Sequence, residues 1–174
     1  HPELARSYNN LAVIYGLLGD RQKQLEFHLK AFTIWEKVLP VDHPDLAKSY
    51  HNLAVTYGNL DAYEKALEFH LKALTIFEAV LPADHPELAN SYSNIGRAYR
   101  DISDYAKGIE YGQKAILIGE ASSPKHPRLS RFYAFLGITY AKSFQYPEAK
   151  AALEKSEKLK AEVWTYQGWA MYYA

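Results

Sequence analysis

The strongest constraint on this sequence is a His-Pro dipeptide that recurs four times at a nearly constant interval. Its histidine stands at positions 1, 43, 85 and 126, which gives intervals of 42, 42 and 41 residues. A period of about 20–50 residues marks a repeat array, in which each unit buries its apolar face against the next. We therefore expect four related units, at residues 1–42, 43–84, 85–125 and 126–160.

Each unit is predicted to be a pair of helices. The proline suits the first turn of a helix, where a missing N–H costs nothing. In the first unit Tyr8, Leu11, Ala12 and Tyr15 fall on one helical face, and similar residues recur there in the other units. No segment alternates like a strand, so the sequence predicts an all-α fold. Second helices are expected at about 21–38, 63–80, 105–120 and 147–160.

This unit resembles the tetratricopeptide repeat. It has that family's large residue, Leu, small residue and Tyr on the first helix, and Tyr63, Ala66 and Ala73 match its second helix. The first unit departs from the pattern with Arg21 and Gln24. The length of about 42 residues, the His-Pro start and an Asn-Asn-Leu-Ala core resemble the kinesin light chain type. The resemblance implies a right-handed superhelical solenoid of antiparallel helix pairs, a single array over residues 1–174.

The last residues, 161–174, form an aromatic segment outside the four units. Trp164, Gly168 and Tyr172 loosely repeat the large residue, small residue and Tyr of a first helix. We expect either a capping helix or the first helix of a partial fifth repeat. The chain begins on a unit boundary, so we interpret it as a segment of a longer protein.

Composition excludes several classes of function. Lys+Arg and Asp+Glu both number 20, and a formal net charge of zero argues against a nucleic-acid binder. The lack of cysteine excludes disulfides, thiol catalysis and cysteine-based zinc sites, and it fits a cytoplasmic protein. No apolar run approaches the about 18–20 residues that span a bilayer, so we expect no membrane insertion.

Catalytic and metal-binding patterns are missing from the sequence. It has no Gly-rich phosphate loop, no Gly-x-Ser-x-Gly elbow and no His-Glu-x-x-His pair, so we expect no enzyme and no cofactor. Four of the seven histidines belong to the His-Pro starts. His28 and His70 are equivalent residues on second helices, and packed helices about 8–10 Å apart do not bring equivalent residues onto one metal ion. We interpret both as structural imidazoles and expect no metal site.

The first helices remain as a candidate binding surface. The family resemblance implies that they line the concave side of the array. Their face away from the second helices is polar and carries a cationic excess, which favours an acidic or carboxylate-bearing peptide. The candidate groove residues are Arg6, Asn9, Asn10, Val13, Lys48, His51, Asn52, Val55, Asn59, Asn90, Asn94, Arg97, Arg100, Arg131, Phe135 and Ile138.

Two features of the pattern have two interpretations each. The column Asn10, Asn52 and Asn94 suits the backbone of an extended peptide, because an amide both donates and accepts, but these residues equally suit contacts between neighbouring units. The third unit has Gly108, Gly112 and Gly119 in its second helix, where glycine disfavours helix. They either make room for the bulky Phe132 and Phe135 of the next helix or form a hinge.

The sequence therefore predicts a non-enzymatic module that binds a peptide segment of a partner protein. The alternative is a structural spacer or self-assembly segment, which forms homo-oligomers through its exposed repeat ends.

Overall fold

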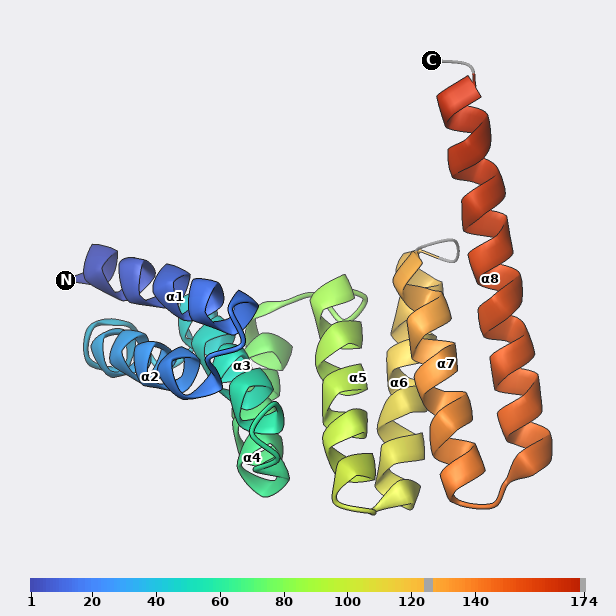
Figure 1. Ribbon diagram of the computed structural model, residues 1–174, viewed down its shortest axis with the longest axis horizontal. Coiled ribbons are helices and arrows are strands. Elements are labelled where there is room, and N and C mark those ends of the chain that lie inside the picture. Colours follow the sequence, from blue (N-terminus) through green and yellow to red (C-terminus); the bar gives the residue numbers. More distant parts are fainter. Residues whose placement is uncertain (124–126, 173–174) are drawn as a thin grey trace. The chain divides into compact units, whose positions relative to one another are not determined.

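The computed structural model describes the backbone of residues 1–123 and 127–172 and the side chains as far as residue 161. Within these residues the chain forms eight helices and no strand (Figure 1). They agree with the predicted helix pairs, apart from longer ends of α6 and α8. The helices are α1 (Pro2–Leu17), α2 (Arg21–Val38), α3 (Pro44–Gly58), α4 (Tyr63–Val80), α5 (Pro86–Asp101), α6 (Tyr105–Ser122), α7 (Pro127–Lys142) and α8 (Tyr146–Tyr172).

The C-terminal segment differs from its prediction. Residues 161–172 do not begin a new helix but continue α8, which runs without a break for 27 residues. The side chains beyond residue 161, Trp164 and Tyr172 among them, lie outside the described residues. A capping role for this segment therefore stays a prediction.

The helices pack into two compact units, residues 1–81 and 82–174, each holding two of the predicted repeats. In the first unit α1 packs on α2, α2 on α3 and α3 on α4. In the second unit α5 to α8 pack in the same order, and α5 also contacts α7. Within each unit the second helix of the first repeat, α2 or α6, thus lies between the first helix of its own repeat and that of the next.

The repeated histidine is a helix cap. The Nδ1 atom of His43 accepts a hydrogen bond from the backbone N–H of Asp45 at 3.0 Å, and His85 accepts one from Glu87 at 3.1 Å. His1 makes a longer contact of the same kind to Glu3, at 3.4 Å. An N-cap side chain satisfies one of the free N–H groups at a helix start. Helix initiation therefore explains the first three His-Pro starts, and His126 lies outside the described residues.

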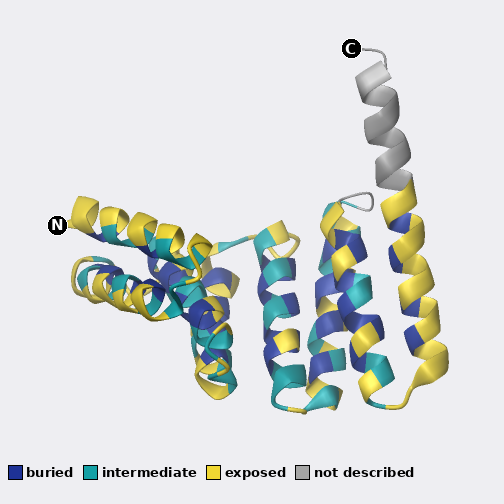
Figure 2. Ribbon diagram, viewed as in Figure 1, coloured by how far each residue is buried: buried dark blue, intermediate teal, exposed yellow. Residues whose placement is uncertain are grey.

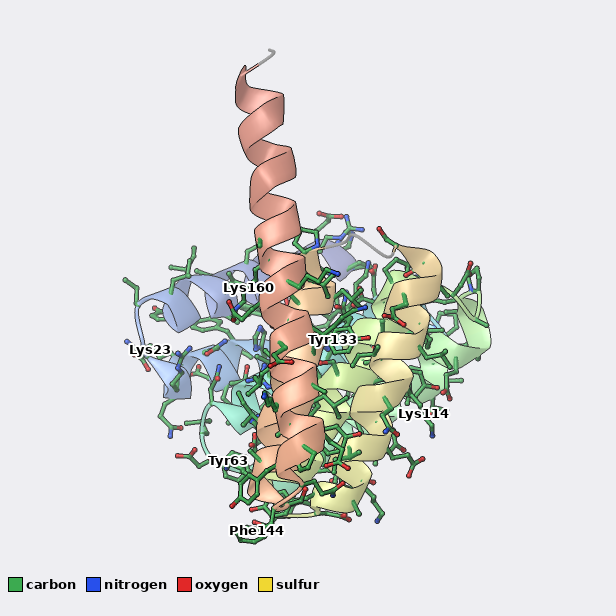
Figure 3. All side chains as sticks on the ribbon, turned by 90° about the vertical axis from the view of Figure 1, so that its right-hand side faces the viewer. Lys23, Tyr63, Lys114, Tyr133, Phe144 and Lys160 are labelled. Carbon is green, nitrogen blue, oxygen red and sulfur yellow. The ribbon has the colours of Figure 1, made fainter. Side chains whose placement is uncertain are left out.

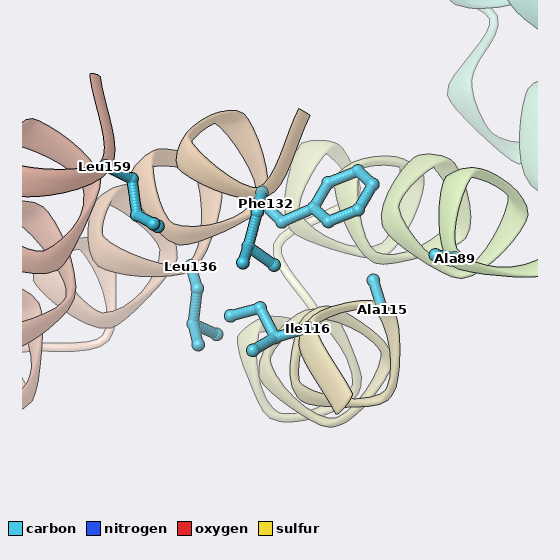
Figure 4. Packing of buried hydrophobic residues seen from close by; sticks show 7 residues of the cluster. Ala89, Ala115, Ile116, Phe132, Leu136 and Leu159 are labelled. Carbon is cyan, nitrogen blue, oxygen red and sulfur yellow. The ribbon is translucent and has the colours of Figure 1, made fainter. Parts of the chain in front are cut away.

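The core of the second unit lies where α6 meets α7 (Figure 4). Ala115 and Ile116 of α6 face Leu129, Phe132 and Leu136 of α7, and all five are buried. Ala89 of α5 and Leu159 of α8 complete the cluster from either side. This core joins α6 to α7 and ties α5 and α8 to them, and so it sets the spacing of the first-helix surfaces.

Glycines of α6 and α5 make room for the two phenylalanines of α7. A Cβ atom on Gly112 would lie 2.9 Å from Cε1 of Phe135, and one on Gly96 would lie 3.1 Å from the same ring. A Cβ on Gly119 would lie 3.1 Å from Cδ1 of Leu129, with Phe132 at an ordinary contact distance of 3.4 Å. Real Cβ atoms rarely approach so closely, because cores are already densely packed. These contacts support the repacking interpretation of the glycines over the hinge.

The turn between the helices of each repeat has a left-handed residue at the same position. Gly19, Asp61, Ser103 and Phe144 have φ values of 81°, 57°, 66° and 63°. Glycine adopts this conformation without cost, whereas a bulky side chain rarely does. Phe144, at the turn between α7 and α8 (Figure 3), is 79% exposed, so burial offers little compensation.

We expect the substitution Phe144→Gly to raise the free energy of unfolding by about 1 kcal/mol, because it removes the steric cost of the left-handed conformation. The matched change Gly19→Ala should lower it by about 1 kcal/mol, since no other group lies within 4 Å of the added Cβ and only the backbone conformation is affected. Urea unfolding measures both. A loss of stability in Phe144→Gly would show that contacts of the ring, such as the edge-on contact to Tyr146, outweigh the strain.

Candidate functional site

The first-helix surface of the first unit comes from α1 and α3. Arg6, Asn10 and Val13 of α1 are exposed, as are Lys48 and Val55 of α3. Arg6 lies 3.1 Å from the carboxylate of Glu3, and the Lys48 amine lies 3.5 Å from Asp45. Both are exposed pairs within one helix, which hold a side chain only weakly. The cations therefore remain accessible to a ligand.

The asparagines of this surface connect the two repeats. The side-chain amide of Asn52 donates to Oδ1 of Asn9 at 2.8 Å, so α3 is tied to α1. The backbone carbonyl of Asn52 accepts from the hydroxyl of Thr56, also at 2.8 Å. This bond gives Asn52 a contact between repeats, but its partner is Asn9 and not Asn10 of the asparagine column. Asn10, one position away from Asn9, is exposed.

A buried histidine continues this network into α2. His28 is 4% exposed, and its Nδ1 lies 2.8 Å from the Thr56 hydroxyl. Thr56 uses its only hydrogen for the Asn52 carbonyl, so Nδ1 of His28 must carry the proton and donate. Nε2 is buried without a hydrogen-bond partner among the described residues. Burial lowers the pKa of His28 to about 4, because a charged imidazole would lose its hydration.

His51 is packed against another histidine. It is half-buried, and its ring meets that of His70 edge to face with the centroids 5.4 Å apart. His70 is 6% exposed, as expected for a structural imidazole. His51 is thus only partly available to a ligand at this surface.

The first-helix surface of the second unit comes from α5 and α7. Arg97 of α5 is exposed, as are Arg131 and Ile138 of α7, and Asn90 is half-buried. Arg131 and Ile138 are seven residues apart and therefore lie on one face of α7. Within the described part of the chain, neither Arg97 nor Arg131 forms an ion pair. These two cations are the least neutralised among the candidates.

Phe135 was wrongly assigned to the groove. It is 6% exposed, and its ring fills the space over Gly96 and Gly112. The guanidinium of Arg100 covers the ring at 5.3 Å and also bonds the carboxylate of Asp101 at 2.8 Å. Arg100 is consequently half-buried and already has two partners. The equivalent position holds Asn in the second and third repeats, which made a surface role the natural expectation.

The other candidates divide by exposure. Nine are exposed and present their side chains to solvent: Arg6, Asn10, Val13, Lys48, Val55, Asn59, Arg97, Arg131 and Ile138. Six are half-buried: Asn9, His51, Asn52, Asn90, Asn94 and Arg100.

Two structural contacts were missed by sequence reasoning. Thr56 joins His28 to Asn52, yet the equivalent residues are Ile14, Ala98 and Thr139, so no repeated pattern marks it. The hydroxyl of Tyr133 donates to Glu120 at 2.7 Å, and burial together with this bond raises the Tyr133 pKa to about 12. The sequence signal for this contact was the glutamate that recurs near the end of the second helices.

The described residues contain neither a metal-binding cluster nor a membrane span. No group of three or more His, Asp or Glu side chains converges as metal ligands would within that part of the chain. None of its helices combines the length and the apolar character needed to cross a bilayer.

A stack of antiparallel helix pairs with polar first-helix faces defines a helical repeat protein of the interaction type. The family model for the tetratricopeptide repeat matches residues 3–79, 56–116 and 87–162. The chain therefore belongs to the tetratricopeptide repeat family. Proteins of this family are generally interaction scaffolds rather than enzymes. The comparison with curated proteins finds no match.

Solved structures share the fold. BtubC from P. vanneervenii superposes with a TM-score of 0.86 at 23% identity, over 94% of this chain and 66% of that one. A Podosopora anserina protein, described as a kinesin light chain with nearly identical TPR-like repeats, gives 0.82 at 26%, over 93% and 77%. Aspartyl phosphate phosphatase F from Bacillus subtilis gives 0.79 at 20%, over 93% and 41%. The chain thus has kinesin light chain-like repeats and spans less than two thirds of some relatives.

Proposed function

We propose that this module binds an acidic or carboxylate-bearing peptide segment of a partner protein on its first helices. The observation that carries the proposal is the pair Arg97 and Arg131, two exposed guanidinium groups that no carboxylate among the described residues neutralises. A guanidinium binds a carboxylate through two parallel hydrogen bonds, which gives both energy and orientation. α5 contacts α7, so we expect one short peptide to reach both residues.

Apolar residues beside these cations supply an anchor. Ile138 is 45% exposed and shares a face of α7 with Arg131. In the first unit, Val13 and Val55 hold the equivalent position and are 48% and 39% exposed. A peptide that alternates acidic and aliphatic side chains matches this surface.

The test is a charge reversal at Arg97→Glu with Arg131→Glu. The probe is a fluorescein-labelled peptide of Glu and Leu residues, and its affinity is measured by fluorescence anisotropy at two salt concentrations. We expect the reversal to weaken binding at least tenfold and to remove most of the salt dependence, because two attractive charge contacts become repulsive.

The matched control reverses two cations of α8, Lys150→Glu with Lys158→Glu. Both are exposed, and the net charge changes equally. This control should lower the affinity only slightly, because it changes the overall charge of the module but not the proposed binding surface. An equal loss in both double variants would contradict the first-helix assignment, since it would mean that net charge alone governs binding.

A structural spacer or self-assembly segment is the second candidate. The observation in its favour is the exposed apolar face of α1, where Ile14 and Leu18 are 50% and 73% exposed. Light scattering over a concentration series separates the two functions. A molar mass that stays monomeric at every concentration removes self-assembly.

A further inference from the structure

Three of the four repeats hold a cluster of three aromatic rings between their two helices. In the first repeat the ring of Phe27 lies between Tyr8 and Tyr15, with centroid distances of 5.9 and 5.3 Å. The arrangement recurs with Phe69 in the second repeat, at 5.9 and 5.4 Å, and with Tyr111 in the third, at 6.0 and 5.3 Å. Ring pairs at these distances attract each other beyond the effect of burial alone. Each cluster thus depends on one ring from the second helix.

The second helix also places a cation over this ring and a carboxylate beside the cation. In the first repeat the Lys30 amine lies 4.8 Å from the centre of the Phe27 ring and 2.6 Å from the Glu26 carboxylate. In the second and third repeats the lysine lies 5.2 and 5.0 Å from the ring and 2.6 and 2.7 Å from the carboxylate. A glutamate, the ring that follows it in the sequence, and a lysine three residues later therefore recur together.

The fourth repeat has the two tyrosines and the lysine but lacks the other two groups. Tyr133 and Tyr140 of α7 are present, and Lys155 of α8 stands at the lysine position. The glutamate and the ring are replaced by Ala151 and Ala152. Ala152 supplies only a methyl group where the other repeats supply a ring, so α7 keeps two half-buried tyrosines without the ring that pairs with both.

Lys155 keeps the place of its counterparts without their carboxylate. Its amine lies 5.8 Å from the centre of the Tyr133 ring, the same distance that separates Lys30 from Tyr8. The side chain is exposed, and within the described part of the chain it forms no ion pair. The carboxylate of Glu120 accepts the Tyr133 hydroxyl at 2.7 Å. A cation that is not neutralised is therefore held beside aromatic surface.

These groups lie on a different side of α7 from the proposed peptide-binding surface. Because an α-helix has 3.6 residues per turn, Tyr133 and Tyr140 lie roughly opposite Arg131 and Ile138. Tyr133 lies beside α8 (Figure 3), and α8 is exposed along most of its described length (Figure 2). A ligand on this side is therefore separate from one on the first-helix surface.

We propose that Tyr133, Tyr140 and Lys155, which we call the two-tyrosine face, bind an aromatic side chain of a partner protein that has a carboxylate next to it. The partner's ring stacks between the two tyrosines over Ala152, and its carboxylate pairs with Lys155. The chain itself shows the complementarity, since its own adjacent glutamate and aromatic residue fill the three equivalent places. Rings and a cation together favour an aromatic ligand with negative charge.

The charge of Glu148 sets the orientation of this ligand. In the first three repeats a lysine lies 5.0 to 5.3 Å from the ring of the second tyrosine, and Glu148 stands at that position in the fourth. A carboxylate there repels the carboxylate of the ligand. The negative group of the ligand is therefore directed away from Tyr140 and toward Lys155.

The probe is the dipeptide N-acetyl-Glu-Phe-amide, which carries the two groups that the fourth repeat lacks. Binding to the full 174-residue chain is followed by NMR through the ring protons of Tyr133 and Tyr140, because a stacked ring shifts the resonances of its neighbours. We expect saturable shifts with a dissociation constant of about 1 mM, since the contact is small. N-acetyl-Glu-Ala-amide and N-acetyl-Gln-Phe-amide should each bind at least about fivefold more weakly.

Two sets of variants locate the binding. Ala151→Glu with Ala152→Phe rebuilds the arrangement of the first repeat, so the dipeptide should no longer shift the tyrosine resonances, while circular dichroism shows a folded protein. Lys155→Gln leaves the packing unchanged and should weaken binding about fivefold. The matched change Lys150→Gln, at an exposed lysine that lies 3.8 Å from Glu154, should have no effect.

The outcomes separate this proposal from the first-helix surface and from other ligands. Arg97→Glu with Arg131→Glu should leave binding of the dipeptide unchanged, whatever its effect on the acidic peptide. Absent shifts, equal binding of the three dipeptides, or undiminished binding after Ala151→Glu with Ala152→Phe would overturn the proposal. Binding of 3-phenylpropionate as tight as that of the dipeptide would assign the face to a free aromatic acid and would overturn the assignment to a protein side chain.

Discussion

Replacing Gly112 with histidine and Phe135 with asparagine together should cost about 3 kcal/mol less stability than the sum of the two single changes. Gly112 stands where the first repeat has His28, and Phe135 stands where the second has Asn52. The contact between α2 and α3 thus uses a histidine and an asparagine, while the contact between α6 and α7 uses a glycine and a phenylalanine. The two arrangements are alternative ways to fill one space.

Each single change disrupts that filling. Gly112→His places a ring where Phe135 already lies, since even a Cβ would be 2.9 Å from the phenylalanine ring and 3.1 Å from Leu136. The cost of such overpacking is about 3 kcal/mol. Phe135→Asn empties the volume of a buried ring, which costs about 3–5 kcal/mol.

The double variant has a partner ready for the new histidine. Thr139 holds the position of Thr56, and its hydroxyl donates to the Phe135 carbonyl at 2.8 Å, as Thr56 donates to Asn52. Its oxygen is therefore oriented to accept from an imidazole at position 112. We expect a coupling energy of about 3 kcal/mol from urea unfolding of the four proteins. Gly112→His combined with Ile138→Asn, an exposed residue of α7, is the control and should show no rescue. If the double variant instead loses the sum of the two single losses in stability, the two arrangements are not alternative ways to fill this space.

Acidification should destabilise the protein through His28. Its pKa is about 4 in the folded chain, against about 6.5 when solvated. Above pH 6.5 both states are neutral and the histidine has no pH-dependent effect. As the pH falls below 6.5, the unfolded chain takes up a proton that the folded chain excludes, so stability is lost progressively down to about pH 4. The expected loss is about 1.4 kcal/mol at pH 5.5 and about 3 kcal/mol at pH 4.

The variant His28→Gln isolates this effect. The variant has no titrating side chain at this position. At pH 7 its free energy of unfolding should be lower than that of the natural sequence, and this difference should shrink as the pH falls. Acidic residues titrate equally in both proteins and cancel in the difference. A constant difference between pH 7 and pH 4, or an NMR titration of the His28 ring near pH 6.5, would contradict the assignment of a buried neutral imidazole.

Much of the local structure was predictable from particular residues. The four prolines placed the starts of the first helices, because proline is accommodated there and not further in. The turns were also predictable, because Gly19, Asp61 and Ser103 are of residue types that favour turns. The small residue at Gly112 and the large one at Phe135 could also be recognised in the sequence. In a repeat, a residue that differs from those at the same position of the other units is easy to see.

The candidate site was less predictable, because exposure depends on packing between helices. Phe135 and Asn52 hold the same position of the repeat, yet the first fills a core and the second bonds Asn9. The difference arises from Gly112 and Gly96, residues of other helices. Arg100 likewise became a cover for Phe135 rather than a ligand group.

The sequence by itself determined the period, the helix pairs, the starts of the first helices and the tetratricopeptide repeat family, since each follows from signals within about one turn of helix or from their recurrence. Only the tertiary structure decided which side chains of the first helices face solvent. It also decided that Leu4, Leu11 and Ile14 are uncovered where their counterparts in α3 and α7 are buried. Equivalent residues are chemically alike in the sequence, and only the presence or absence of a neighbouring helix separates a core position from a binding surface.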